Sequence, residues 1–365
     1  MAKLQEFRDL EIRKAIQGLD FEGKSVVVRV DYNCPVSAGQ VTNNFRIKQS
    51  LPTLNLIKEG GAKKIVLISH FDRPEGKFNK EMSLGPVREE LEKLWGEKIS
   101  MPEFNEDYRR YFRDIEEGQE KIYLAENIRF WKEEEAGDSA FAFVMSDGYD
   151  FFINEAFSAS HRKHASITGI SSYLPSFAGL ELADECREIW RKMTVMISPS
   201  VALVGGAKIE TKVPVLKTLG KYYDKIILGG KIALEYEKYA NENPEADVWM
   251  TKVQLPQGYS DENKFDISEE AALEFVEIIK DAKKILWNGP VGKFEDERYA
   301  VGSEIIARSV SQNQEASRLV GGGDTIALLE KNDLLDKVGF VSTGGGAMLE
   351  YIGDGTLPGL EVIEF

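Results

Sequence analysis

Cysteine is scarce in this sequence: Cys34 and Cys186 are the only two among 365 residues. Two cysteines this far apart exclude a disulfide scaffold and are typical of a protein from a reducing compartment. Histidine is also rare, and three histidines with two distant cysteines do not give the ligand spacing of a zinc site. We therefore expect a cytoplasmic protein without structural zinc.

Long hydrophobic runs are missing too. The longest apolar stretches, residues 64–69 and 200–205, fall far short of the roughly 20 residues that a membrane helix needs. Residues 1–10 lack the apolar core of a signal peptide. Acidic residues outnumber basic ones, 61 to 46, which gives a net charge of −15. Nonspecific attraction to nucleic acid or to an anionic membrane is therefore not expected.

The recurring pattern in the sequence is a short apolar, β-branched run followed at once by charged or glycine-rich residues and then by a helical stretch. Continuous apolar runs of this length suit strands that are buried on both faces of a parallel sheet. We therefore predict an α/β fold with two parallel sheets. Ser268 to Lys280 is one predicted helix, with Ser268 as its cap. The predicted strands are residues 26–30, 65–68, 122–124 and 151–153 in the first half, and 201–204, 226–228, 285–287, 319–320 and 340–341 in the second.

A domain boundary is predicted near the middle of the chain. Residues 171–179 interrupt the pattern with Pro175 and Gly179. A single helical segment follows, and Ser198-Pro199-Ser200 closes it. The simplest interpretation is an N-terminal domain, a connecting helix and a C-terminal domain, which agrees with about 150 residues per domain. The alternative is one continuous sheet with this helix as an ordinary crossover. The helix carries an apolar stripe of Leu182, Cys186, Ile189 and Met193.

Basic side chains follow the predicted strands of the first half. Ligands of open parallel sheets bind at the carboxyl ends of the strands, so residues just after each strand are candidate site residues. Arginine forks match phosphate and carboxylate oxygens two at a time, which predicts a pocket for a small polyanion. The alternative is that each arginine pairs with a nearby surface glutamate. The residues of this set are Arg29, Asp31, Asn33, Arg46, His70, Arg73, Arg129, His161, Arg162 and His164.

Glycine dominates the corresponding positions of the second half. Glycines between a strand and a helix let amide N–H groups and the helix N-terminus hold phosphate. One such loop could be a plain turn, but five on one edge of one sheet favour a nucleotide. Asp324, directly after three glycines, is either a ligand of phosphate-bound magnesium or a helix cap. The loops are residues 205–208, 229–230, 288–290, 321–325 and 343–347.

Two common nucleotide motifs are absent. No Gly-x-x-x-x-Gly-Lys-Ser/Thr occurs, which excludes a P-loop enzyme, and no Gly-x-Gly-x-x-Gly follows the first strand, which argues against a dehydrogenase. A polyanion pocket in one half and a nucleotide pocket in the other suit phosphoryl transfer, where catalysis is mostly positioning and neutralisation of charge. Two hinged domains would also exclude water, which otherwise accepts the phosphoryl group.

A series of sequence blocks resembles, in order, the motifs of the phosphoglycerate kinase family. The resemblance extends from about residue 7 to 360, and it implies two Rossmann-like domains, each a parallel β-sheet flanked by helices, joined by a connecting helix and hinge. The implied domains are 1–177 for the glycerate substrates, 178–198 for the helix and 199–352 for the nucleotide, with a tail, 353–365, that returns to the N-terminal domain. The blocks are residues 28–35, 69–74, 126–130 and 160–162, then 205–212, 287–292 with 294–295, 321–325 and 342–347.

The family's residue roles transfer onto matching positions of this chain. Asp31, Asn33, Arg46, His70, Arg73, Arg129 and Arg162 are implied to bind 3-phosphoglycerate or 1,3-bisphosphoglycerate. Arg46, Lys208, Gly344 and Gly345 are implied to be catalytic. The nucleotide is implied to contact Gly206, Ala207, Lys208, Lys212, Gly230, Asn288, Pro290, Glu295, Gly323, Asp324 and Thr325, and Asp324 is implied to bind Mg²⁺.

The activity implied by the resemblance is reversible, Mg²⁺-dependent transfer of a phosphoryl group from 1,3-bisphosphoglycerate to ADP, in a monomer. A catalytically impaired homologue and a nonenzymatic two-domain anion-binding protein are the alternatives. The chain departs from the common motifs at Phe71-Asp72, where Leu-Gly is usual, and at Glu155, where Asp is usual. Ser160 stands in place of Ala, and Lys231 changes the glycine segment that starts at Gly229.

Overall fold

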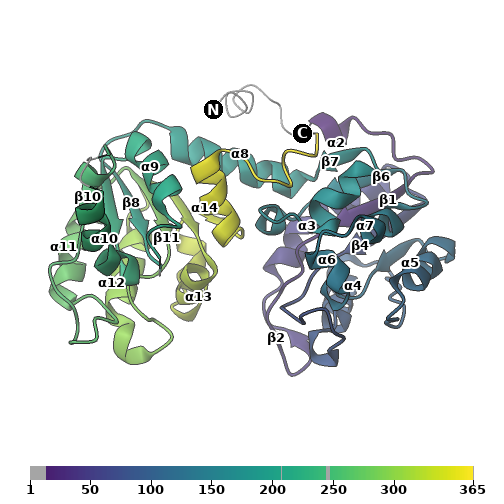
Figure 1. Ribbon diagram of the computed structural model, residues 1–365, viewed down its shortest axis with the longest axis horizontal. Coiled ribbons are helices and arrows are strands. Elements are labelled where there is room, and N and C mark those ends of the chain that lie inside the picture. The colour runs from purple at the N-terminus through teal and green to yellow at the C-terminus, as the bar shows by residue number, and fades with distance from the viewer. Residues whose placement is uncertain (1–13, 207, 244–246, 365) are drawn as a thin grey trace. The chain divides into compact units, whose positions relative to one another are not determined.

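The computed structural model describes residues 14–206, 208–243 and 247–364 (Figure 1). The chain divides into two compact units: the first contains the residues up to Arg187 together with the C-terminal segment from Thr356, and the second is Glu188–Gly355. The chain therefore passes between the units twice, at residues 187–188 and 355–356. No helix among the described residues is long and apolar enough to cross a membrane.

A five-stranded parallel sheet, in the order β5-β4-β1-β6-β7, forms the centre of the first unit. Val26 and Val28 of β1 pack into one hydrophobic core and Val27 into another, so the strand is buried on both faces. This explains why its apolar residues run continuously instead of alternating with polar ones. The strands are β1 (Ser25–Arg29), β4 (Lys64–Ile68), β5 (Ile122–Leu124), β6 (Phe151–Asn154) and β7 (Ser176–Ala178), beside a small hairpin of β2 (Val36–Ser37) and β3 (Gln40–Val41).

Helices connect these strands and cover the sheet. The longest one within the first unit is α3 (Phe45–Glu59), which follows the hairpin and carries Arg46 in its first turn. The others are α2 (Lys14–Gln17), α4 (Gly85–Trp95), α5 (Tyr108–Glu117), α6 (Lys132–Glu135) and α7 (Ser139–Ser146), with short turns η1 (Lys80–Met82), η2 (Ile128–Phe130), η3 (Phe157–Ala159), η4 (Ala165–Gly169) and η5 (Ile170–Ser172).

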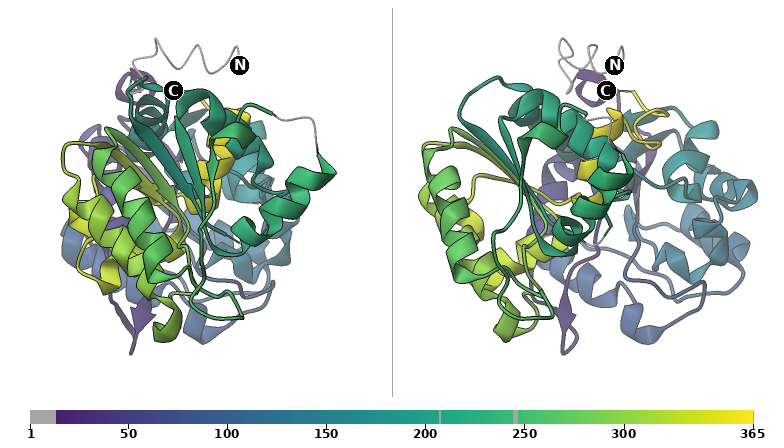
Figure 2. Two further views of the ribbon diagram at one scale, coloured as in Figure 1. Left: turned by 90° about the vertical axis from the view of Figure 1, so that its left-hand side faces the viewer. Right: turned by 60° about the vertical axis from the view of Figure 1, so that its left-hand side comes forward.

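The second unit has a six-stranded parallel sheet in the order β10-β9-β8-β11-β12-β13, with helices on both faces (Figure 2). The predicted helix at Ser268 is confirmed, and the Ser268 hydroxyl accepts a hydrogen bond from the Ala271 amide. The strands are β8 (Ser200–Val204), β9 (Lys225–Leu228), β10 (Val253–Gln254), β11 (Lys284–Asn288), β12 (Ser317–Gly321) and β13 (Phe340–Ser342). The helices are α9 (Val213–Tyr222), α10 (Gly230–Glu242), α11 (Glu269–Asp281), α12 (Val301–Gln312), α13 (Gly323–Lys331) and α14 (Gly345–Asp354), with turns η6 (Met250–Lys252), η7 (Glu297–Tyr299) and η8 (Leu335–Lys337).

Helix α8 (Leu180–Thr194) contains the point at which the chain leaves the first unit. Its predicted apolar stripe is buried throughout: Leu182, Cys186, Ile189 and Met193 are each at most 1% exposed. Before it, residues 171–179 are more regular than the sequence indicates, because η5 and the edge strand β7 lie there. Pro175 cannot donate a backbone hydrogen bond, and β7 accordingly begins only after it.

Buried lysines at the first positions of two strands play the same structural role in the two units. Lys64, which opens β4, donates to the carbonyls of Ile115, Glu116 and Gly118 at the end of α5, at 2.6–2.9 Å. Lys284, which opens β11, donates at 2.8–2.9 Å to the carbonyls of Met193, Val195 and Tyr222, at the ends of α8 and α9. An ammonium group satisfies carbonyls that have no partner in the helix and complements the helix dipole.

Carboxylates gather around the first turn of α8. Burial raises the pKa of Glu155 to about 7, and burial with the nearby charges of Glu185, Glu155 and Asp184 raises the pKa of Glu181 to about 8. Gln49 donates a 2.7 Å hydrogen bond to Glu181. The cluster therefore favours the protonated form of both glutamates relative to the unfolded chain.

The raised pKa of Glu181 predicts a pH-dependent stability. A carboxyl whose pKa is higher in the folded state stabilises the fold fully below its unfolded pKa, and this stabilisation is lost as the pH rises from about 4.5 to about 8. Glu181→Gln removes that titration. Between pH 5 and pH 8, the free energy of unfolding of the wild type should therefore fall by about 2 kcal/mol more than that of the variant. Urea unfolding at the two pH values measures this difference, and parallel pH profiles would contradict it.

Candidate functional site

The carboxyl ends of the first unit's strands surround a small polar pocket of about 180 Å³. All seven residues expected to bind the glycerate substrates line it, so the structure brings together side chains from five separate segments of the chain. Asp72, Ser158, Ala159 and His161 complete its wall. The seven expected residues are Asp31, Asn33, Arg46, His70, Arg73, Arg129 and Arg162.

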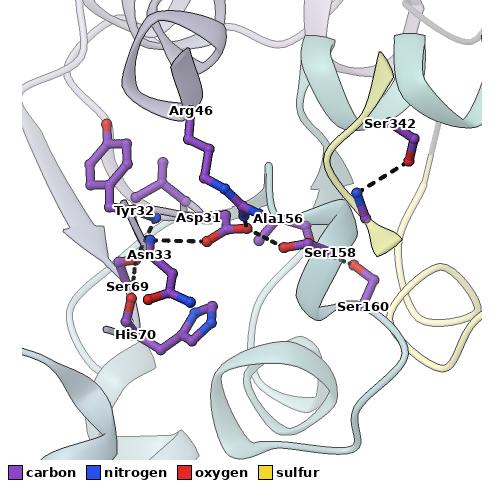
Figure 3. A network of polar contacts seen from close by, with 12 residues as sticks. Asp31, Tyr32, Asn33, Arg46, Ser69, His70, Ala156, Ser158, Ser160 and Ser342 are labelled. Carbon is purple, nitrogen blue, oxygen red and sulfur yellow. Dashed lines mark hydrogen bonds and ion pairs between the residues drawn. The ribbon is translucent and has the colours of Figure 1, made fainter. Parts of the chain in front are cut away.

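Asp31 orients Arg46 in this pocket (Figure 3). The two side chains form an ion pair, and the Ser158 hydroxyl donates to the same carboxylate. The Asn33 amide donates to the other Asp31 oxygen at 3.1 Å, and the Asn33 side chain accepts a 3.0 Å bond from the Asp72 amide. These contacts fix the loop after β1 and hold the guanidinium of Arg46 at the pocket wall.

Positive charge accumulates around the remaining residues of this pocket, which we call the anion pocket. Arg129 is 4% exposed, and burial together with the neighbouring guanidinium groups of Arg162 and Arg73 lowers its pKa, against Glu135, whose carboxylate lies 3.2 Å from its Nε. Burial and four arginines hold the pKa of His70 well below its usual range, so its ring is neutral. Cations that depress one another's pKa form a site that a bound anion would stabilise.

Arg29 and His164 do not line the anion pocket, although both were candidates by position. Arg29 is the last residue of β1 and is 1% exposed; it donates to Ser166 at 2.9 Å and lies 3.2 Å from His70 Nδ1, behind the pocket wall. The ring of His164 is buried and lies 3.6 Å from the Glu134 carboxylate. Both side chains support the pocket from behind and do not reach it.

The second unit has a larger pocket, of about 550 Å³, at the carboxyl ends of its strands. We call it the glycine-lined pocket, because seven glycines form its wall. It combines the ends of β8 and β11 with the first turns of α10 and α13. Of the expected nucleotide contacts, Gly206, Lys212, Gly230, Asn288, Pro290, Glu295, Gly323, Asp324 and Thr325 line it.

Close packing of backbone makes glycine necessary at two of these positions. A Cβ atom on Gly205 would lie 2.2 Å from the carbonyl oxygen of Pro290. Gly289 has a φ of +96°, and a Cβ atom added to it would lie 2.8 Å from the backbone of Gly205. The Thr325 hydroxyl accepts a 2.8 Å bond from the Gly289 amide, which ties the β11 loop to α13. The result is a rigid backbone surface beside helix N-termini, the kind of surface that holds phosphate oxygens.

Asp324 supplies one exposed carboxylate at the start of α13, and it lines the glycine-lined pocket. No group of three or more metal-ligating side chains occurs among the described residues. Magnesium that arrives with a nucleotide takes most of its ligands from phosphate and water and needs only one or two protein carboxylates. A single acidic residue next to a phosphate-binding surface fits that requirement.

Three expected residues do not line this pocket, and a fourth falls outside the described residues. Lys208 is exposed and does not line the glycine-lined pocket, and Ala207 lies outside the described residues. Gly344 and Gly345 are at the start of α14 and also do not line it; the Gly344 amide donates to the Ser342 hydroxyl at 3.2 Å. The roles of these four, like the roles of the residues that line the two pockets, stay predictions.

Several residues that line the glycine-lined pocket come from segments other than the strand ends. Lys231 and Leu234 come from α10, and Asn263, Lys264 and Phe265 from the loop before α11. Lys293 lies 5.7 Å from the centre of the Phe265 ring. None of these residues directly follows a predicted strand, so a search of strand ends could not find them.

An anion pocket in one unit and a glycine-lined pocket beside helix N-termini in the other suit an α/β phosphotransferase. A family model for phosphoglycerate kinase matches residues 16–255 and 238–354. The chain is 36% identical to the phosphoglycerate kinase of Borrelia garinii subsp. bavariensis, across 94% of this chain and 97% of that protein. It is 34% identical to the enzyme of Moorella thermoacetica, with the same two coverages. The chain belongs to the phosphoglycerate kinase family.

Solved structures agree with this assignment. The phosphoglycerate kinase of Coxiella burnetii superimposes with a TM-score of 0.74 at 32% identity, over 94% of this chain and 97% of that one. The Pyrococcus horikoshii enzyme, at 24% identity and a TM-score of 0.75 over 95% of this chain and 97% of that one, has the same fold. The chain is accordingly a kinase of glycolysis that transfers a phosphoryl group between small-molecule substrates.

Proposed function

We propose that this enzyme catalyses reversible transfer of a phosphoryl group from the acyl phosphate of 1,3-bisphosphoglycerate to ADP, which gives 3-phosphoglycerate and ATP. The observation that carries the proposal is the anion pocket, where guanidinium groups from four segments of a chain with net charge −15 converge. Arg73 and Arg162 in this pocket form no ion pair with any residue that the structure describes. A small polyanion would neutralise this cluster.

In the first unit, Arg73, Arg129 and Arg162 would hold the 3-phosphate, with His70 as a further contact. Since burial among cations keeps the His70 ring neutral, one ring nitrogen can donate and the other accept. Asp31 holds Arg46 in place, and Arg46 would act on the phosphoryl group during transfer. An acyl phosphate is already activated, so the reaction requires charge stabilisation and alignment but no covalent nucleophile.

In the second unit, the glycine-lined pocket would hold the nucleotide. Backbone amides around Gly323 and Thr325 would contact its phosphates, Lys212 would pair with them, and Glu295 would accept hydrogen bonds from the ribose. Burial lowers the pKa of Lys212, against the opposing charge of Glu350, and an added phosphate would favour its charged form. Mg²⁺ would be held by Asp324 and would neutralise phosphate charge.

Transfer requires groups from both units, so we propose in-line transfer after a hinge movement that excludes water. Lys208 and the amides of Gly344 and Gly345 would then stabilise the phosphoryl group together with Arg46. The first unit, the helix α8 and the second unit would correspond to glycerate-binding, connecting and nucleotide-binding parts. We further propose a cytoplasmic, monomeric enzyme.

A coupled assay with 3-phosphoglycerate, Mg²⁺ and either ATP or GTP tests this function. Wild-type enzyme should turn over, and Arg46→Ala should lose at least about tenfold in kcat, because a charge-stabilising donor is removed. Lys48→Ala, an exposed substitution two residues further along α3, is the matched control and should stay within twofold of wild type.

Two alternatives to the active enzyme would appear in this assay as an absence of turnover. A folded protein that binds 3-phosphoglycerate but does not turn over with either nucleotide would be an impaired homologue or an anion-binding protein. Calorimetric titration with 3-phosphoglycerate alone separates these outcomes from loss of the anion pocket itself. Equal activity of Arg46→Ala and wild type would remove Arg46 from the mechanism.

A further inference from the structure

Glu155, the first residue after β6, caps the beginning of α8 from outside the helix. Its carboxylate accepts hydrogen bonds from the amides of Glu181, at 3.2 Å, and Leu182, at 3.3 Å. The Thr53 hydroxyl donates to the same carboxylate and accepts from the Leu180 amide at 2.8 Å. Glu155 and Thr53 together therefore satisfy the first three amides of α8, which have no partners within the helix.

The fit between Glu155 and α8 is tight. Glu155 is 6% exposed, and a Cβ atom on Gly179 would lie 1.7 Å from its Oε2 atom, so only glycine is tolerated just before the helix. The Gly179 amide also donates to the Asn154 carbonyl at 2.8 Å, which fixes the turn onto the end of β6. A buried carboxylate with this many donors is a built contact and not an incidental one.

The loop that Glu155 begins, residues 155–162, also forms part of the anion pocket. Ser158 donates to Asp31, and His161 and Arg162 line the pocket wall. The carbonyl of Ser160 in the same loop accepts a 2.8 Å bond from the Gly359 amide of the C-terminal segment. One loop thus contacts both segments through which the chain passes between the units, α8 and the residues after Gly355.

We propose that Glu155 is a positioning residue for phosphoryl transfer, which transmits anion binding on the loop 155–162 to the first turn of α8. This inference rests on the function proposed above, because it takes 3-phosphoglycerate as the anion. When Arg162 and His161 engage the anion, the loop is fixed, and Glu155 fixes the amides of α8 in turn. Anion binding thereby holds the start of α8, the helix that leads into the second unit, more firmly than these contacts do alone.

Hydrogen exchange measures this transmission without turnover. In wild-type enzyme, 3-phosphoglycerate alone should slow exchange of the α8 amides at residues 180–182 by about tenfold. A change of this size corresponds to a modest coupling free energy between two sites. In Glu155→Gln, where an amide NH₂ replaces one accepting oxygen, 3-phosphoglycerate should still bind within twofold of its wild-type affinity, but the slowing at α8 should disappear. Retained slowing in this variant would overturn the inference.

Kinetics give a second readout that a purely structural role would not produce. Glu155→Gln should lower kcat about tenfold, because misplacement of reacting groups is costly, while KM for 3-phosphoglycerate stays within twofold. Thr53→Val removes the hydroxyl bridge and keeps the carboxylate, so it should lower kcat by a smaller factor and also leave KM within twofold. This second variant keeps the inference testable if Glu155→Gln does not fold. Unchanged kcat in both folded variants would overturn the inference.

Asp266 offers a matched control in the second unit. It is a buried carboxylate that accepts from the amides of Gly302, at 2.8 Å, and Ile267, at 2.9 Å, and so caps α12, which does not connect the units. Asp266→Asn should lower the melting temperature as Glu155→Gln does, yet leave kcat within twofold of wild type; an equal loss of kcat would mean that destabilisation alone explains both variants. Absence of turnover and of 3-phosphoglycerate binding in the wild type would instead contradict the proposed function itself.

Discussion

Replacement of Lys208 by alanine is expected to lower kcat by a factor on the order of 10²–10³, the scale of losing one key charge-stabilising donor. Lys208 follows β8 by four residues, is exposed, and lies outside the wall of the glycine-lined pocket. Such a side chain contributes little to holding the nucleotide in the ground state. We therefore expect KM for nucleotide to change less than threefold, because only an interaction made in the transition state is removed. Steady-state kinetics with both substrates varied measures this split.

Lys221→Ala is the matched control for this prediction. Lys221 is another exposed lysine of the second unit, near the end of α9, and it does not line the glycine-lined pocket. Its removal changes the net charge of the protein by the same amount, so a general electrostatic effect on anionic substrates would appear in both variants. If Lys208→Ala and Lys221→Ala show the same kcat, Lys208 has no part in the transfer step.

Strand positions were predictable from the sequence because parallel strands in both units are buried on both faces. The run at β11, for example, is apolar without interruption, and the structure extends the prediction by one residue at each end. At β1 the predicted run includes Arg29, and the strand begins and ends one residue earlier than predicted. The edge strands β7 and β10 were not predicted. β7 begins directly after Pro175, and β10 has only the two residues Val253 and Gln254, so neither has a run long enough to stand out.

The anion pocket was largely predictable for a topological reason: parallel strands bring all their carboxyl ends to one edge, so residues after different strands must lie near one another. What position alone could not decide is the direction of a side chain. Arg29 and Asp31 are two residues apart, yet Arg29 ends β1 and points into the protein while Asp31 reaches the pocket. Phe265 was missed because it comes from an irregular loop, whose path no local pattern specifies.

Replacement of Lys284 by methionine is expected to destabilise the second unit by about 3 kcal/mol or more. The variant keeps most of the side-chain volume but leaves the buried carbonyl of Met193 and the partly buried carbonyls of Val195 and Tyr222 without their donor. Each unsatisfied buried acceptor costs about 1–3 kcal/mol, while removal of a buried charge offsets part of the loss. Burial lowers the pKa of Lys284 to about 8, and its ammonium lies 4.0 Å from the centre of the Tyr223 ring.

Lys64→Met is the internal comparison, since Lys64 caps α5 in the first unit with the same three-carbonyl geometry. A protein of two units need not unfold in one step, so scanning calorimetry can resolve separate transitions. Lys284→Met should lower the transition of the second unit, which nucleotide binding raises, and Lys64→Met the transition that 3-phosphoglycerate raises. If each variant instead shifted both transitions equally, the lysines would stabilise the whole chain as one cooperative body, and the two helix ends would not be anchored separately.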